Sequence, residues 1–140
     1  MNLLNSDNFW QFACTLYAKP EQQQTLLGLQ NQQGKNVNLC LLLYYLDSLN
    51  LTISQTQLNK LEQSISEFDK MALKPLRATR AYLKANQTEI ADYAVIRKEL
   101  ISAELKLEKQ QQQILIDAAN EFEFLEAVRP NNMSLYITVA

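Results

Sequence analysis

Five basic residues between positions 70 and 84 are the first candidates for chemistry in this sequence. They recur three or four positions apart with no acidic residue among them: Lys70, Lys74, Arg77, Arg80 and Lys84. On a helix, this spacing places four of them close to one face, with Arg80 beside them. Such a face could neutralise the phosphates of RNA or DNA, or hold the carboxylate of a small ligand.

The distribution of acidic residues offers another role for the same side chains. Residues 69–98 carry seven Lys/Arg against three acids, whereas residues 99–140 carry three against seven. The net charge of the chain is −2, so the whole protein has no general attraction for nucleic acid or anionic membranes. We therefore expect the basic face to pair with an acidic final helix, through Glu99, Glu104 or Glu108.

Two polar residues accompany the most apolar segment, residues 37–49. Asn38 lies near its start and Asp47 near its end. An ionised carboxylate in a core needs a partner, and Arg77 or Arg80 could reach Asp47. We expect Asp47 to form a structural ion pair and not a catalytic one. Asn38 is expected to be a hydrogen-bonded buried amide and not a group that recognises a ligand.

The composition argues against most common catalytic sites. The chain has no histidine and two glycines, which excludes catalytic triads, imidazole metal ligands and glycine-rich phosphate loops. Cys14 and Cys40 each lie in an apolar run, so both are expected to be inert buried thiols. We expect no catalytic residue, metal or cofactor, although lysine, carboxylate or cysteine chemistry stays open. Glu121, Glu123 and Glu126 are typical of a helix surface.

Helical periodicity and capping residues predict the elements that position these side chains. Ser6 or Asp7 begins a helix that runs to Tyr17. Pro20 begins a second, which ends at Gly34. Asn36 caps a third over residues 37–49. This third segment is apolar on every side, which is typical of a central helix, although a buried strand is the alternative.

The second half of the chain predicts longer helices. Ser54 and Gln57 form a capping box for a helix to about Ala72. Pro75 either opens a helix over residues 76–84 or kinks a continuous one. Asp92 is expected to cap a last helix that reaches about Leu125.

That last helix would be about 50 Å long. The radius of gyration of such a domain is about 14 Å, so one end must bend back or project. The glutamine run 110–113 interrupts the apolar stripe of the helix and is a candidate weak point. Residues 133–140 have β character, and this tail could pack back, extend loosely or add to a partner's sheet.

The length and the ends of the chain complete the expected organisation. A chain of 140 residues forms one domain, here residues 1–128, with residues 129–140 as a tail. The start of the sequence does not resemble a signal peptide, and the longest apolar run, residues 39–46, is too short to cross a bilayer. We expect a cytoplasmic protein with an all-α fold: a compact bundle of about five or six helices around a buried central helix, with a long C-terminal helix.

Three stretches, taken together, resemble a known family of short proteobacterial proteins, domain-of-unknown-function family 2390. They are residues 9–13 with Leu16, Tyr17 and Pro20; residues 29–30 leading through Gly34 into residues 37–43; and residues 75–77 with Arg80, Leu83 and Lys84. A looser match follows at residues 103–105. The family has no established activity. The resemblance implies a bacterial cytoplasmic helical protein, with Trp10, Gln30, Asn38, Arg77 and Arg80 at the motif positions.

These observations lead to one main functional expectation and two alternatives. We expect a non-enzymatic protein-interaction module that uses the basic stripe or the long helix, with a protein partner still to be identified and its oligomeric state open. One alternative is an RNA-binding accessory protein that uses the basic stripe. The other is a protein that binds a small anionic ligand near Trp10, Tyr44, Tyr45 and Arg77. The candidate binding residues are Arg77, Arg80, Lys74, Lys84, Lys70, Trp10, Asn38 and Tyr44.

Overall fold

The centre of the fold is α3 (Val37–Ser48), in a computed structural model that describes residues 4–137. Asn36 caps this helix, because its side chain accepts a hydrogen bond from the Leu39 N–H at 2.9 Å. Eight of its twelve residues are buried, among them Leu39, Leu42 and Leu43 with no exposed surface. The predicted central helix is confirmed, and the alternative of a buried strand is wrong.

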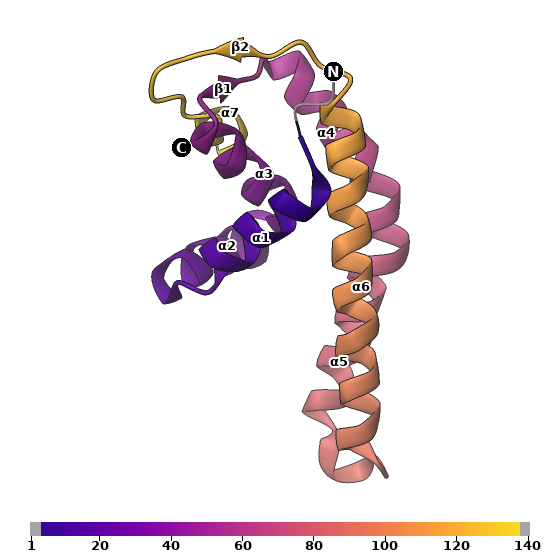
Figure 1. Cartoon of the computed structure of the whole chain (residues 1–140). Helices are drawn as coiled ribbons and strands as arrows, with labels where there is room; N and C mark the ends of the chain where they lie inside the picture. Colours follow the sequence, from indigo (N-terminus) through magenta and orange to yellow (C-terminus); the bar gives the residue numbers. More distant parts are fainter. Residues whose placement is uncertain (1–3, 138–140) are drawn as a thin grey trace.

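The described residues form six helices of 12 to 27 residues, with short elements between and after them (Figure 1). The longer helices are α1 (Ser6–Tyr17), α2 (Pro20–Gln33), α3, α4 (Gln55–Phe68), α5 (Lys74–Ala85) and α6 (Tyr93–Ala119). Two residues each of β1 (Leu51–Thr52) and β2 (Leu125–Glu126) pair antiparallel, with Leu51 opposite Glu126. The predicted all-α fold with a long helix near the C-terminus is confirmed. None of the helices within residues 4–137 combines the length and the apolarity needed to cross a bilayer.

Local capping signals place the first four helices as predicted. Pro20 lies in the first turn of α2, and Gly34 ends that helix with a left-handed φ of 66°. Ser54 and Gln57 form both bonds of the capping box at the start of α4. The first helix differs by one residue, because Asn5 is its cap and accepts a hydrogen bond from the Asn8 N–H.

The path from α4 to α5 is continuous and passes through a π-helical turn, Asp69–Leu73. The Lys74 N–H donates to the Asp69 carbonyl, five residues earlier. Pro75 follows directly and has no backbone N–H. The i→i−4 hydrogen bonds of an α-helix would lose one bond at this residue, and the wider π-helical turn lies next to it. The predicted fourth helix therefore ends at Phe68, and the helix that contains Pro75 begins at Lys74.

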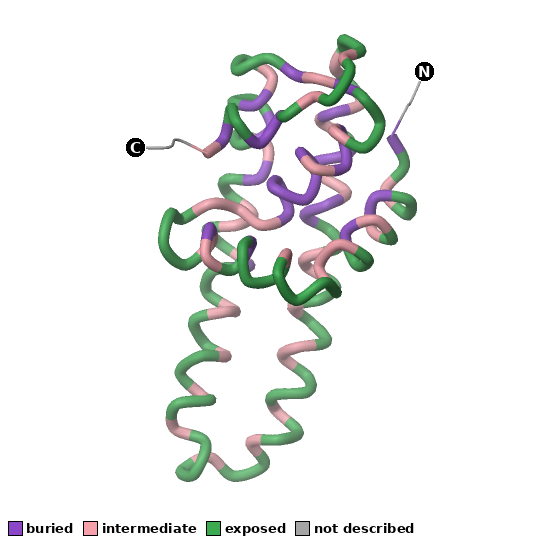
Figure 2. The backbone as a smooth tube through the Cα atoms, turned by 90° about the vertical axis from the view of Figure 1, so that its left-hand side faces the viewer, coloured by how far each residue is buried: buried purple, intermediate pink, exposed green. Residues whose placement is uncertain are grey.

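The described part of the chain divides into a helical head and a projecting arm. The head surrounds α3 with α1, α2, α7 (Met133–Tyr136) and the adjoining ends of α4 and α6. The arm consists of α5 packed on the first half of α6, joined by the 3-10 turn η2 (Gln87–Glu89). Figure 2 shows that the arm residues are exposed or half-buried, and α5 has no buried residue. The long helix was expected either to bend back or to project, and it projects from the head.

Two expectations about α6 are wrong. The helix ends at Ala119 and not near Leu125, because the Asn120 side chain bonds the backbone of Leu4 and Leu125 pairs with Thr52. Asp92 is at the N-cap position of α6 as expected, with a φ of 58° and no capping hydrogen bond from its side chain. The glutamine run is not a weak point, since Gln111 and Gln112 are 0% and 2% exposed inside a continuous helix.

The C-terminal segment packs back onto the head, which is one of its three expected outcomes. Its conformation is helical and not extended at Met133–Tyr136, and both end residues of this turn are buried. The Tyr136 hydroxyl accepts a hydrogen bond from the Asn36 N–H at 2.9 Å, so α7 reinforces the start of α3. The expected extended residues 138–140 lie outside the described part of the chain.

Candidate binding cleft

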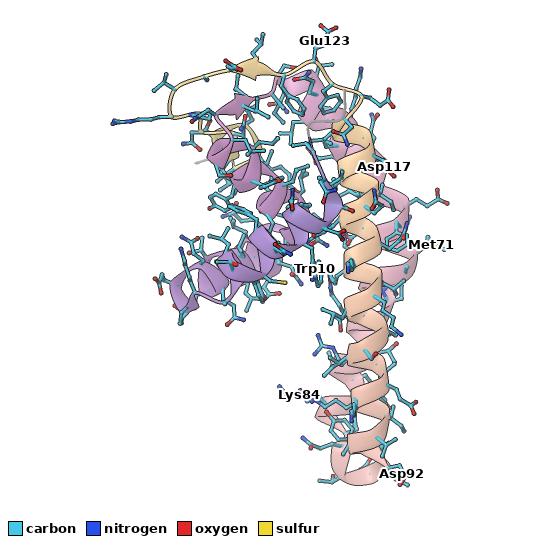
Figure 3. The ribbon with its side chains drawn as sticks, in the orientation of Figure 1. Trp10, Met71, Lys84, Asp92, Asp117 and Glu123 are labelled. Carbon is cyan, nitrogen blue, oxygen red and sulfur yellow. The ribbon has the colours of Figure 1, made fainter. Side chains whose placement is uncertain are left out.

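A cavity of about 580 Å³ lies where the head meets the arm. Pockets of 300–1,000 Å³ are usual for ligands and for anchor side chains of a partner. Five helices line it: α1, α2 and α3 from the head, and α5 and α6 from the arm. Figure 3 shows Trp10 in the angle between α1 and α6. The lining includes exposed residues Cys14, Leu27 and Leu105, so the cavity opens to solvent as a cleft.

Four of the eight predicted binding residues come together in this cleft. Trp10, Asn38, Arg77 and Arg80 line it from three different helices, α1, α3 and α5. The other four, Lys70, Lys74, Lys84 and Tyr44, do not line the cleft. The three lysines are exposed on the outside of the π-turn and α5.

Neither of the two tyrosines expected near the ligand lines the cleft. Tyr45 is buried in the head, where its ring centroid lies 5.4 Å from that of Phe9 and 5.1 Å from that of Phe12. Tyr44 is half-buried against the core. Aromatic character at the cleft comes instead from Trp10 and Tyr17.

Arg77 and Arg80 form ion pairs with α6, as the distribution of charge predicts. Arg80 donates from Nε to Glu104 Oε2 at 2.7 Å and from Nη2 to Glu104 Oε1 at 3.3 Å. Arg77 donates from Nη2 to Glu108 and lies 3.7 Å from Glu104. Glu99, the third expected partner, is exposed and takes part in none of the ion pairs found within residues 4–137.

Asp69 completes a balanced set of charges beside the cleft. It lies 3.8 Å from Arg77 and 3.7 Å from the Lys74 ammonium. The carboxylates of Asp69, Glu104 and Glu108 are therefore balanced by three cations. These are Lys74, Arg77 and Arg80. The hydrogen bond to Glu104 raises the pKa of Arg80, against the opposing effect of burial. This wall of the cleft is close to neutral and offers little attraction to a phosphate or carboxylate.

A network of buried amides forms the floor of the cleft and continues behind it. Asn38, 3% exposed, donates from Nδ2 to Glu108 Oε2 at 2.6 Å and to Gln111 Oε1 at 2.9 Å. Gln111 Oε1 also accepts from the Asn36 side chain at 3.2 Å. Asn38 is therefore the hydrogen-bonded buried amide that was expected, and it also lines the cleft. Burial raises the pKa of the Tyr17 hydroxyl, which also lines the cleft.

Gln112 is the one member of this network with an unused group. Its Nε2 donates to Asn38 Oδ1 at 3.1 Å. Its Oε1 has no hydrogen-bond partner, and it is the only buried side-chain polar atom in residues 4–137 of which this is true. Gln112 lines the cleft and is 2% exposed. An interrupted apolar stripe is the only sequence signal that points to this residue.

Two expectations outside the arginines need correction. Asp47 does not pair with Arg77 or Arg80; it accepts hydrogen bonds from Asn132, at 3.0 Å from the backbone N–H and 2.7 Å from the side chain. Cys14 is exposed at the edge of the cleft and not buried. Cys40 is buried as expected, and burial raises the pKa of its thiol to about 12.

Comparison with known proteins gives a family and no activity. No curated protein and no solved structure matches the chain. A family model described as "Protein of unknown function (DUF2390)" matches residues 8–115, which include most of α1, all of α2 to α5 and most of α6. Every residue that lines the cleft falls within that match. The chain therefore belongs to the DUF2390 family.

Proposed function

We propose that this protein is a non-enzymatic interaction module that binds a segment of a protein partner in the cleft between head and arm. The observation that carries the proposal is the cleft itself, a solvent-open cavity of about 580 Å³ with largely apolar walls. The free thiols of Cys14 and Cys40 suit a reducing compartment, so we further propose that the module works in the bacterial cytoplasm.

Apolar surface at the mouth of the cleft supports a peptide segment as the occupant. Leu27 from α2 is 37% exposed, and Leu105 from α6 is 55% exposed. Both line the cleft, as do Ile101 and Leu41 deeper within it. An apolar mouth around a polar floor resembles a site for an anchor side chain whose neighbours on the partner cover the mouth. Such contiguous apolar surface is typical of interaction sites.

The charge distribution favours this proposal over the two alternatives. RNA binding requires cations that are free to neutralise phosphates. Arg77 and Arg80 are committed to Glu104 and Glu108, and Lys74 lies near Asp69, which leaves the exposed Lys70 and Lys84. An anionic small ligand would have to displace the same carboxylates from the arginines. An uncharged, mainly apolar segment meets neither obstacle.

A pair of matched variants on α6 tests the proposal. A photo-cross-linking amino acid at Leu105 should capture a discrete partner in the producing cells, whereas the same group at Val95 should not. Val95 is 57% exposed on the same helix, but it does not line the cleft.

The captured partner must then be purified and titrated against the full chain. Leu27→Glu should weaken that binding at least about tenfold, because a charge would be buried at the mouth of the cleft. Val95→Glu should leave it unchanged. Equal affinity for the two variants would refute the cleft as the binding site.

A further inference from the structure

We propose that the segment bound in the cleft is residues 121–128 of a second copy of this chain. This inference rests on the proposed function and names the partner. It is carried by two exposed surfaces of opposite charge. One is an acidic and apolar segment on the head, and the other is the cleft, whose apolar mouth continues into a basic face of the arm.

Residues 121–128, the acidic segment, present apolar side chains to solvent. Val128 is 91% exposed and Leu125 is 72% exposed, the highest values among the large apolar residues that the structure describes. Phe122 and Phe124 hold the segment in place, because both pack against the core and their ring centroids lie 6.1 Å apart. Leu125 and Val128 are therefore held outward on a fixed element, which is typical of an interaction site.

The same segment carries negative charge without a partner of its own. Glu121, Glu123 and Glu126 are exposed, and none of them takes part in the ion pairs found within residues 4–137. The segment contains no lysine or arginine. Its charges are thus available to cations on another molecule.

The cleft continues along the arm into a basic face, formed by Lys84 and Arg97. Lys84 lies seven positions after Arg77, and Arg97 lies four positions before Ile101. These spacings keep each cation on the cleft side of its helix, about 10 Å and about 6 Å further along the arm. Figure 3 shows Lys84 on the side of the arm toward which α1 and α2 extend. Both cations are exposed, and neither joins an ion pair in the described part of the chain.

The two surfaces complement each other in both of their properties. The uncharged anchors Leu125 and Val128 match the exposed apolar mouth of the cleft, and the glutamates match the basic face of the arm. The glutamates therefore need not displace Glu104 or Glu108 from the arginines of the cleft wall.

The segment must come from another copy. It is fixed to β1 by the β1–β2 pair, at the end of the head away from the arm (Figure 1), so it cannot enter the cleft of its own chain. Because the two contacting surfaces differ, the contact is heterologous and can join copies in series.

Sedimentation equilibrium of the purified full chain tests for this association directly. A segment of eight residues buries less surface than a standard interface, so we expect weak binding. The average mass should exceed that of one chain as the concentration rises from about 10 µM to about 1 mM. Added salt should reduce the association, because the pairing charges are exposed. A mass that stays at one chain throughout would overturn the inference.

Single variants assign the association to the two surfaces. Val128→Glu on the segment and Leu27→Glu at the mouth of the cleft should each lower the association constant at least about tenfold. Val95→Glu is the matched control, because Val95 is 57% exposed and lies outside both surfaces, and it should have no effect. Association that survives either of the first two changes would overturn the inference.

Charge reversal separates direct pairing from a general loss of structure. One double variant carries Lys84→Glu and Arg97→Glu, and the other carries Glu123→Lys and Glu126→Lys. Each alone should associate at least about tenfold more weakly than the unchanged chain. An equal mixture of the two should recover the association, because each arm then faces a segment of opposite charge. A mixture no stronger than its components would overturn the inference.

The proposed function is decided by a different result. If Leu105 cross-links to another protein and the purified chain stays single, the proposed function stands and this inference is wrong. If Leu105 captures nothing and the chain stays single, both are wrong.

Discussion

Arg80 and Glu104 face each other across the arm and share two hydrogen bonds, from Nε at 2.7 Å and from Nη2 at 3.3 Å. This paired geometry is the strongest form of contact between a guanidinium and a carboxylate. It joins α5 to α6 at the edge of the cleft, where few buried apolar residues are available to hold the two helices together. The main structural role of Arg77 and Arg80 is therefore to connect the two helices of the arm.

Replacement of Glu104 should loosen the arm. Glu104→Ala removes the partner of Arg80 and one neighbour of Arg77. Because Arg80 is partly exposed, solvent screening limits the loss to about 1 kcal/mol in the free energy of unfolding. Urea denaturation measures it. Glu99→Ala, at an exposed position of the same helix, should change stability by less than about 0.5 kcal/mol. Similar losses for both variants would contradict a specific role for the pair.

Asn38 should be among the most sensitive polar residues of the head. Asn38→Leu leaves Gln111, Gln112 and Glu108 without bonds that they now make in the interior. We expect a loss of about 2–4 kcal/mol in the free energy of unfolding, because several buried groups lose partners at once.

Chemical denaturation of Asn38→Leu beside Asn59→Ala checks this expectation. The exposed Asn59 side chain accepts one hydrogen bond from Gln55, so its loss should be small. A loss below about 1 kcal/mol for the Asn38 variant would show that water or rearranged side chains replace the network.

The local elements could be predicted because their signals lie within a few residues of each other. The Asn36 cap, the Ser54–Gln57 capping box and the left-handed Gly34 each depend on contacts at most five or six residues away. The end of α6 depends instead on Asn120 and its bonds to Leu4, 116 positions earlier. Periodicity carries no information about such a contact, so the predicted helix ran on to Leu125.

The cleft could be predicted only in part, for a related reason. Trp10 and Arg77 lie on amphipathic helices, where the apolar stripe shows which side faces inward. The central helix is apolar on every side, so its rotation cannot be inferred from its pattern, and Tyr44, a predicted binding residue, does not line the cleft. Gln112 looked like an interruption of the stripe because its partner, Asn38, lies 74 positions away.

Asp47 should make stability depend on pH in a defined direction. Burial raises the pKa of its carboxyl above the ordinary 3.8, against the opposing hydrogen bonds from Asn132. The folded state therefore binds a proton more readily than the unfolded state. The contribution of Asp47 to stability falls as pH rises from about 3.8 through the folded pKa.

Asp47→Asn removes this titration while keeping an acceptor for Asn132. The stability of the unchanged protein relative to this variant should rise as pH is lowered from 7 toward 4. Urea denaturation of both proteins across that range gives the difference directly. A difference that stays constant or falls on acidification would show that the hydrogen bonds from Asn132 outweigh burial.

The two cysteines should react very differently with a thiol reagent in the native protein. Cys14 is exposed at the edge of the cleft, whereas Cys40 is buried in α3 and its pKa is raised to about 12. Because the thiolate is the reactive form, Cys40 is protected both by burial and by its protonation. At pH 8, a disulfide reagent should therefore modify one thiol per chain rapidly and the second only on unfolding. Cys14→Ser should abolish the rapid phase, while Cys40→Ser should retain it. Rapid modification of both thiols in the native protein would contradict the burial of Cys40.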